Sequence, residues 1–134
     1  MVLMKILLVE DSPDIANIYS FNLESEGHSV EVASTGAVAL QKVLTFEPEV
    51  ILLDVLLPDM DGILVLQKIR TDPQFSHLKP RILITSNMLQ DDIAEKAKFY
   101  KAEGYYVKAD LHNQDLVNIM EELSKRIKFN NGDG

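Results

Sequence analysis

Residues 50–54 read Val-Ile-Leu-Leu-Asp, an apolar run that ends abruptly in a carboxylate. A short apolar run without alternating polar residues is typical of a strand that is covered on both faces, as in a parallel sheet. Similar runs occupy residues 5–9 and 82–84, and polar residues follow each of them. Residues 29–33 and 104–107 are weaker candidates for two further strands. We therefore predict a sheet of five strands.

The segments between these runs carry apolar residues at helical spacing, so strand and helix alternate as five βα units. This alternation predicts an α/β fold, with a doubly wound five-stranded parallel sheet, right-handed crossovers and helices on both faces. Helix and turn boundaries are marked by Ser12-Pro13, Gly27 and Asp72-Pro73. The apolar faces of the five expected helices include Ile15, Ile18, Tyr19 and Leu23; Leu40, Val43 and Leu44; Leu66 and Ile69; Ile93, Ala94 and Ala97; and Leu116, Ile119, Met120 and Leu123.

The length and composition of the chain correspond to one globular domain. It has 134 residues, of which 46% are hydrophobic and 25% are charged. We predict that residues 1–128 form this domain. Residues 129–134 are polar and glycine-rich, so we expect a flexible tail or the remnant of a linker there.

Charge and cysteine content exclude several classes of function. The chain contains no cysteine, so neither a disulfide framework nor a thiolate metal site is available to it. A net charge of −8 opposes binding to nucleic acid or to an anionic membrane surface. No stretch approaches the roughly 18 apolar residues of a membrane span, and the amino terminus lacks the pattern of a secretory signal. We therefore expect a soluble, cytoplasmic protein.

Polar residues stand where the expected strands end. Glu10 and Asp11 follow the first run, Asp54 the third, Thr85 the fourth and Lys108 the fifth. The carboxyl ends of parallel strands meet at one edge of the sheet, which is where doubly wound folds bind ligands. We therefore expect these side chains to line one crevice.

Three carboxylates in one crevice repel one another unless they share a cation or one of them is protonated. Oxygen ligands alone favour Mg²⁺ over zinc. A hydroxyl and a lysine beside such a site would complete a cradle for a phosphate group. Each residue taken singly also has a structural interpretation: Glu10 and Asp11 as a helix cap, Thr85 as an ordinary strand-end hydroxyl, and Lys108 as a solvated cation.

These residues belong to four motifs that follow one another along almost the whole chain: Ile6-Leu7-Leu8-Val9-Glu10-Asp11, Ile51-Leu52-Leu53-Asp54-Val55-Leu56-Leu57-Pro58-Asp59-Met60-Asp61-Gly62, Ile82-Leu83-Ile84-Thr85-Ser86 and Gly104-Tyr105-Tyr106-Val107-Lys108. With these motifs the sequence resembles the receiver domains of response regulators in two-component signalling, including the single-domain chemotaxis regulator. The resemblance implies a flavodoxin-like fold with strand order 2-1-3-4-5.

The resemblance also implies roles for the acidic residues of the crevice. It makes Asp54 the acceptor of a phosphoryl group. It assigns Mg²⁺ to Asp11, to Asp54 and to the backbone carbonyl of Leu56, with Glu10 often acting through water. Phosphoryl transfer needs an in-line nucleophile together with positive charge and donors around the phosphoryl oxygens, so these roles are physically consistent.

The same resemblance assigns Thr85 and Lys108 to the phosphoryl oxygens. In the family, the threonine-type hydroxyl moves toward the phosphoryl group and an aromatic side chain of the fifth strand turns inward; here the pair is Thr85 and Tyr105. Tyr106 should point to the opposite face, because side chains alternate along a strand. The implied output surface is the fourth helix, fifth strand and fifth helix, which is also a candidate surface for a homodimer.

The implied phosphodonor is a phosphohistidine on a sensor histidine kinase or on a phosphotransfer protein, or a small compound such as acetyl phosphate. The domain would catalyse its own phosphorylation in a phosphorelay without being a turnover enzyme. Its phosphorylation would control a downstream protein that the sequence does not identify.

Two residues depart from the family pattern. Ala109 replaces the usual proline after the lysine. A cis bond before a residue other than proline costs about 2.5–4 kcal/mol, so we predict a trans Lys108–Ala109 peptide and a slightly displaced lysine. Leu56 stands two residues after the acceptor, where other receivers often carry a polar side chain. Since leucine cannot orient an attacking water, we predict slow loss of phosphate from Asp54.

Other residues near the acceptor have structural interpretations. Pro58 and Gly62 are expected to shape the turn that leads away from Asp54. Asp59 and Asp61 are interpreted as solvated loop acids, with tuning of the metal site as the less favoured alternative. The three histidines lack a repeated spacing and make a poor metal set: His28, His77 and His112.

Three alternative functions stay open. A phosphatase of the haloacid dehalogenase-like class also forms an aspartyl phosphate, but it needs a second acid where Leu56 stands. A flavin- or nucleotide-binding protein needs a phosphate-cradling loop after the first strand, where the acidic residues 10–14 would repel a phosphate. A degenerate receiver would serve only as an interaction module, for which the retained acids, Thr85 and Lys108 have no evident use.

Overall fold

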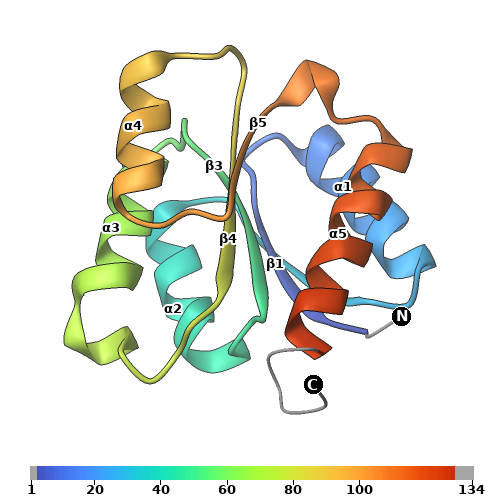
Figure 1. Ribbon diagram of the computed structural model, residues 1–134, viewed down its shortest axis with the longest axis horizontal. Coiled ribbons are helices and arrows are strands. Elements are labelled where there is room, and N and C mark those ends of the chain that lie inside the picture. The colour runs from blue at the N-terminus through green and yellow to red at the C-terminus, as the bar shows by residue number, and fades with distance from the viewer. Residues whose placement is uncertain (1–2, 129–134) are drawn as a thin grey trace.

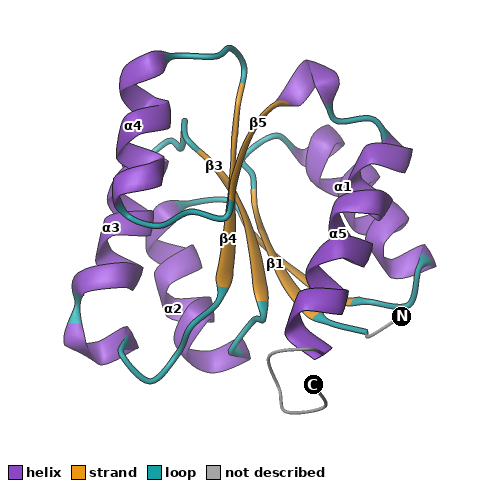
Figure 2. Ribbon diagram, viewed as in Figure 1, coloured by secondary structure: helices purple, strands orange, loops and turns teal. Residues whose placement is uncertain are grey.

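The computed structural model describes residues 3–128 and contains a five-stranded parallel sheet. Its strands lie in the order β2-β1-β3-β4-β5. Figure 2 shows the strands in orange between two layers of helices. The predicted fold class and strand order are thereby confirmed. The strands are β1 Lys5–Val9, β2 Ser29–Ala33, β3 Val50–Asp54, β4 Arg81–Ser86 and β5 Gly104–Val107.

The α-helices of the described chain cover both faces of this sheet. One face carries α1 and α5, and the other carries α2, α3 and α4 (Figure 1). Two short 3-10 helices follow α3 and β5. The helices are α1 Pro13–Ser25, α2 Gly36–Phe46, α3 Gly62–Thr71, η1 Pro73–Phe75, α4 Asp91–Phe99, η2 Lys108–Asp110 and α5 Asn113–Lys128.

The continuous apolar runs arise because the central strands contribute to two cores. Along β1, Ile6 and Leu8 belong to the core under α1 and α5, whereas Leu7 and Val9 belong to the core under α2, α3 and α4. All the residues of β3 are buried. A strand that is buried on both faces has no position for a polar residue until it reaches the edge of the sheet.

Two strands continue into the polar residues that were expected to follow them. Asp54 is the last residue of β3, and Thr85 and Ser86 are the last residues of β4. They remain in the sheet because they pair in register: Asp54 lies opposite Thr85, and Ser86 lies opposite Val107 of β5. The sheet therefore carries these polar groups on rigid backbone.

Local sequence signals begin and end the helices as predicted. Ser12 caps α1, its hydroxyl accepting a hydrogen bond from the N–H of Ile15 (3.4 Å), and Pro13 occupies the first turn. Asp72 ends α3 and caps η1. Gly27 turns the chain toward β2 with a φ of 98°, in the left-handed region that glycine tolerates.

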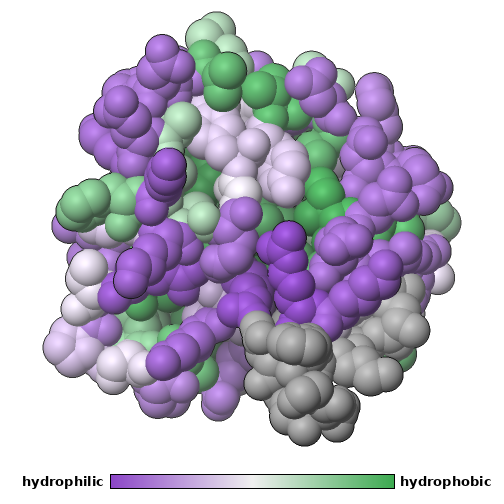
Figure 3. All heavy atoms as spheres, in the orientation of Figure 1, coloured by the Kyte–Doolittle hydropathy of each residue, from purple (hydrophilic) through white to green (hydrophobic). Residues whose placement is uncertain are grey.

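Figure 3 shows the side chains on one face of the molecule. On the face drawn in Figure 3, hydrophilic side chains surround scattered hydrophobic ones. Among the helices within residues 3–128, none combines the length and the apolar character that are needed to cross a bilayer. The tail predicted at residues 129–134 lies outside the described residues.

His28 is a buried polar residue in the connection between α1 and β2. It is 5% exposed, and its Nδ1 accepts a hydrogen bond from the backbone N–H of Met4 at 3.1 Å. Burial lowers the pKa of His28 below its usual value, although Glu26 and Glu49 oppose this shift. The neutral imidazole of His28, the residue before β2, therefore holds the backbone of Met4, the residue before β1.

We expect the protein to lose stability as the pH falls through about 6.5, the pKa of an unperturbed histidine. The pKa of His28 is lower in the folded state, so the unfolded chain binds the proton first. This stability is fully present above that pH and is lost progressively as the pH falls toward the lower pKa of the folded state. Denaturant unfolding at about pH 7.5 and 5.5 measures the loss. His28→Asn retains an acceptor near the position of Nδ1 without titrating, and it should lose less. Equal losses in both proteins would contradict the prediction.

Candidate functional site

The predicted crevice residues meet at the carboxyl edge of the sheet. Glu10, Asp54 and Thr85 are buried there, with exposures of 3%, 4% and 3%, whereas Asp11 is exposed. Lys108 enters from the first residue of η2, directly after β5. The ends of four neighbouring strands therefore supply the site, as the alternation of strands and helices predicted.

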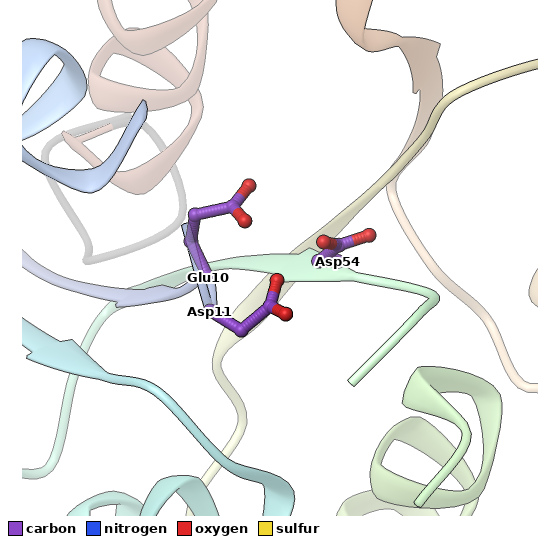
Figure 4. A group of neighbouring side chains, drawn as sticks. All are labelled: Glu10, Asp11 and Asp54. Carbon is purple, nitrogen blue, oxygen red and sulfur yellow. The ribbon is translucent and has the colours of Figure 1, made fainter. Parts of the chain in front are cut away.

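Three carboxylates form a compact cluster at this edge. One oxygen from each of Glu10, Asp11 and Asp54 lies within 4.8 Å of the others. Figure 4 shows the carboxyl groups from the end of β1 facing the same space as that of Asp54. The donors are hard carboxylate oxygens, which are the ligands that Mg²⁺ prefers. The residues present therefore fit the predicted metal.

Lys108 connects two members of this cluster. Its Nζ lies 2.7 Å from Oε1 of Glu10 and 2.7 Å from Oδ2 of Asp54. Burial alone would lower the pKa of Lys108, but its hydrogen bonds to Asp54 and Glu10 outweigh this effect, and the pKa is raised. The ammonium group is therefore charged and shared between two carboxylates.

The acids of the cluster outnumber its lysine. Burial raises the pKa of Glu10 and the charge of Asp54 adds to the shift, while hydrogen bonds from Lys108 and from the N–H of Ser12 (3.0 Å) oppose it. Asp11 adds a further carboxylate nearby. One ammonium group cannot neutralise three carboxylates, and this excess of negative charge favours the binding of a cation.

The loop of residues 55–61 leaves β3 in a sharp turn. The N–H of Leu56 donates to Oδ1 of Asp54 at 3.1 Å, and the Leu56 side chain is 70% exposed. The loop is closed by Gly62, whose N–H donates to the carbonyl of Val55. A Cβ on residue 62 would lie 2.1 Å from the carbonyl oxygen of Asp54, so only glycine fits. The structural interpretation of Gly62 is confirmed.

The peptide between Lys108 and Ala109 is trans, as predicted, because residues 3–128 contain no cis peptide bond. The lysine reaches both Glu10 and Asp54 from this backbone. Its displacement relative to the family pattern stays a prediction.

Tyr105 and Tyr106 point to opposite faces of the sheet, as predicted from strand alternation. Tyr105 packs on the core under α2, α3 and α4, and Tyr106 packs on the other core. The hydroxyl of Tyr105 lies 3.0 Å from Oγ of Ser86 and donates to the carbonyl of Met88 at 3.3 Å. The Ser86 hydroxyl also donates to that carbonyl. The contact of Ser86 with Tyr105 was not predicted from the sequence, because it depends on the pairing of β4 with β5.

Asp59 and Asp61 are exposed loop acids, as predicted, but each also accepts backbone hydrogen bonds. Asp61 caps α3, accepting a hydrogen bond from the N–H of Ile63 at 2.8 Å. Asp59 accepts hydrogen bonds from the N–H groups of Gly36 and Ala37, and these lower the pKa of Asp59. A residue such as Asp61, which caps the helix directly after it, can be predicted from the sequence. A residue such as Asp59, which binds the amino terminus of a helix distant in the sequence, cannot.

Comparisons with known proteins agree with this geometry. The sequence profile of the response regulator receiver domain matches residues 6–121. The chain belongs to the response regulator receiver domain family. The receiver domain has the fold of a CheY-like receiver domain protein from Methanospirillum hungatei, with a TM-score of 0.82 and 27% identity over 95% of this chain and 98% of the other. CheY4 of Vibrio cholerae is similar, with a TM-score of 0.81 and 27% identity over 91% of this chain and 99% of that chain.

Curated relatives of the receiver domain are longer proteins. It is 33% identical over 89 residues to the DNA-binding dual master transcriptional regulator RpaA of Synechocystis sp., a match covering 66% of this chain and 37% of the relative. It is 46% identical over 66 residues to the regulator PhoP of Bacillus subtilis, a match covering 49% and 28% of the two chains. The matched part is thus about a third of each regulator. Membership of the receiver family decides against the phosphatase and flavin-binding alternatives.

Asp11→Asn should stabilise the receiver domain in the absence of divalent cations. Asp11 adds negative charge to a cluster in which acids already outnumber the lysine. Its replacement should raise the free energy of unfolding by roughly 0.5–1 kcal/mol at low ionic strength. Denaturant unfolding in EDTA measures the change, and Glu95→Gln removes an exposed acid of α4 as a control. A less stable Asp11→Asn variant would contradict this electrostatic account.

Proposed function

We propose that this receiver domain accepts a phosphoryl group on Asp54 and signals its phosphorylation state to another protein. The observation that carries the proposal is the contact of Lys108 with both Glu10 and Asp54. Holding a partly buried lysine between two buried carboxylates is costly for a structural scaffold, whereas phosphoryl transfer needs a nucleophile and a cation in one place. The neighbouring hydroxyl of Thr85 supplies a further donor.

Mg²⁺ is the metal that we propose for the carboxylate cluster. Asp11, Asp54 and the backbone carbonyl of Leu56 would hold it, and Glu10 would act through water. When bound, Mg²⁺ would offset the excess negative charge and polarise the phosphoryl oxygens.

The chain's own residues orient the nucleophile in the proposed reaction. The N–H of Leu56 and Nζ of Lys108 each hold one oxygen of Asp54, at 3.1 and 2.7 Å. A carboxylate oxygen of Asp54 forms a bond to phosphorus while the P–N bond of a phosphohistidine breaks, and the bonding electron pair stays on the imidazole. Thr85 and Lys108 then donate to the phosphoryl oxygens and stabilise their charge.

We propose Thr85 and Tyr105 as the switch. Movement of the Thr85 hydroxyl toward the phosphoryl group would open space into which Tyr105 turns. That rotation would take the Tyr105 hydroxyl away from Oγ of Ser86 and from the carbonyl of Met88, and so remove contacts that hold the loop before α4. The α4-β5-α5 surface would then change and act on a downstream protein or form a homodimer.

The proposed phosphodonor is a sensor histidine kinase or a phosphotransfer protein, and the proposed location is the cytoplasm. Acetyl phosphate would replace the protein donor, because the receiver supplies the catalytic groups. With a net charge of −8, direct binding of nucleic acid by this chain is not expected. The relatives that are named as transcriptional regulators extend well beyond the matched region.

Acetyl phosphate with Mg²⁺ should add the mass of one phosphoryl group to the chain and shift the NMR signals of the Tyr105 ring. Asp54→Asn should abolish both changes, because it removes the nucleophile. Asp61→Asn retains a cap for α3 and should behave like the wild type. Equal phosphorylation of Asp54→Asn would overturn the proposal, and an unreactive wild type would favour an interaction module alone.

Leu56→Asn should speed the loss of phosphate from Asp54 severalfold. The exposed Leu56 side chain cannot bind a water molecule, whereas an amide could hold one near the phosphorylated residue. Dephosphorylation after removal of acetyl phosphate is followed by mass spectrometry. Leu56→Met, which stays apolar at similar volume, is the matched control. An unchanged or slower rate in Leu56→Asn would show that this side chain does not limit hydrolysis.

A further inference from the structure

Asp59 fastens the loop of residues 55–61 to α2. The N–H of Gly36 donates to Oδ1 of Asp59 at 2.8 Å, and the N–H of Ala37 donates to Oδ2 at 3.0 Å. The next N–H of α2, on Val38, donates to the hydroxyl of Thr35 at 3.1 Å. The amino terminus of α2 is therefore satisfied in part by its own cap and in part by a loop that is distant in sequence.

An apolar contact adjoins this polar one. A Cβ on Gly36 would lie 2.5 Å from Cγ and 2.7 Å from Sδ of Met60, so the lack of a side chain at residue 36 lets Met60 lie on the first turn of α2. Met60 packs on the core under α2, α3 and α4, and Leu57 is buried in that core. The middle of the loop is thus seated on α2 by polar and apolar contacts.

The remaining contacts of the loop fix its two ends. The N–H of Val55 donates to the carbonyl of Thr85, and Leu56 forms an isolated bridge with Asp61. Among the hydrogen bonds within residues 3–128, the two that Asp59 accepts join residues 57–60 to α2. Asp59 therefore supplies the polar part of the contact that holds residues 57–60, beside the packing of Leu57 and Met60.

We propose that Asp59 is a positioning residue for metal binding, which holds the backbone carbonyl of Leu56 in place beside Asp54. This inference rests on the proposed function, in which that carbonyl is a ligand of Mg²⁺. Both oxygens of Asp59 are occupied by α2, so Asp59 acts through the loop and not as a ligand. A ligand on a fixed loop binds more tightly because less conformational entropy is lost on binding.

The test compares the affinity for Mg²⁺ alone in four proteins, by calorimetry and by NMR titration, in about 0.3 M salt to screen general charge effects. Asp59→Ala removes both hydrogen bonds of the tether. Asp59→Asn removes the charge but retains an acceptor oxygen. Thr35→Ala removes the side-chain cap of α2 without changing a loop residue. It therefore serves as a control for the destabilisation of α2 that Asp59→Ala would cause.

Asp59→Ala should bind Mg²⁺ roughly tenfold more weakly than the wild type, as is usual when a residue that orients a metal ligand is lost. Asp59→Asn keeps one acceptor oxygen for one of the two N–H groups and should recover part of this loss. Thr35→Ala should bind as the wild type does while melting at a lower temperature. Equal affinities in Asp59→Ala and Thr35→Ala would overturn the inference. Equal losses in Asp59→Ala and Asp59→Asn would also overturn it, because the hydrogen bond that asparagine retains would then contribute nothing.

Asp11→Asn separates this inference from the proposed function. If Mg²⁺ binds the wild type but not Asp11→Asn, the proposed metal site stands, and the Asp59 variants then decide the role of the loop. If Asp11→Asn binds Mg²⁺ as the wild type does, the proposed metal site fails and the inference fails with it.

Discussion

The arrangement of the site depends on Lys108, whose ammonium group lies between the buried carboxylates of Glu10 and Asp54. Each carboxylate would be costly to bury alone, and each comes from a different strand. The lysine arrives from the end of a further strand, so three segments must be correctly placed for the charges to meet. Asp11 leaves the cluster with an excess of negative charge, which makes the site receptive to a cation.

The sheet makes this arrangement possible. Its central strands are covered on both faces, so polar side chains can enter only at the edge where the strands end. Asp54 and Thr85 are adjacent members of the β3–β4 ladder, and their separation is therefore set by backbone hydrogen bonds. Asp54 and the neighbouring Thr85 thus stand on strands, while Leu56 and Met88 belong to loops.

The sequence was informative wherever a local pattern has one physical explanation. Double burial produces continuous apolar runs, and parallel topology brings strand ends together, so the fold and the meeting of Asp54 with Lys108 were predictable. Contacts between distant segments were not: Asp59 reads as a solvated acid until α2 is placed beside it. The pairing of Ser86 with Tyr105 was hidden for the same reason, because it depends on how neighbouring strands and their side chains pack.

The two loops that flank the site differ in how they are held. The loop after β3 is seated on α2 by the carboxylate of Asp59 and by the packing of Met60. The loop after β4 is held through its carbonyl at Met88, by hydroxyl groups of Ser86 and Tyr105. Breaking the neutral hydrogen bonds to the carbonyl of Met88 costs less free energy than breaking the two charge-assisted hydrogen bonds to the carboxylate of Asp59. We therefore expect the loop beside Asp54 to be held more firmly than the loop before α4.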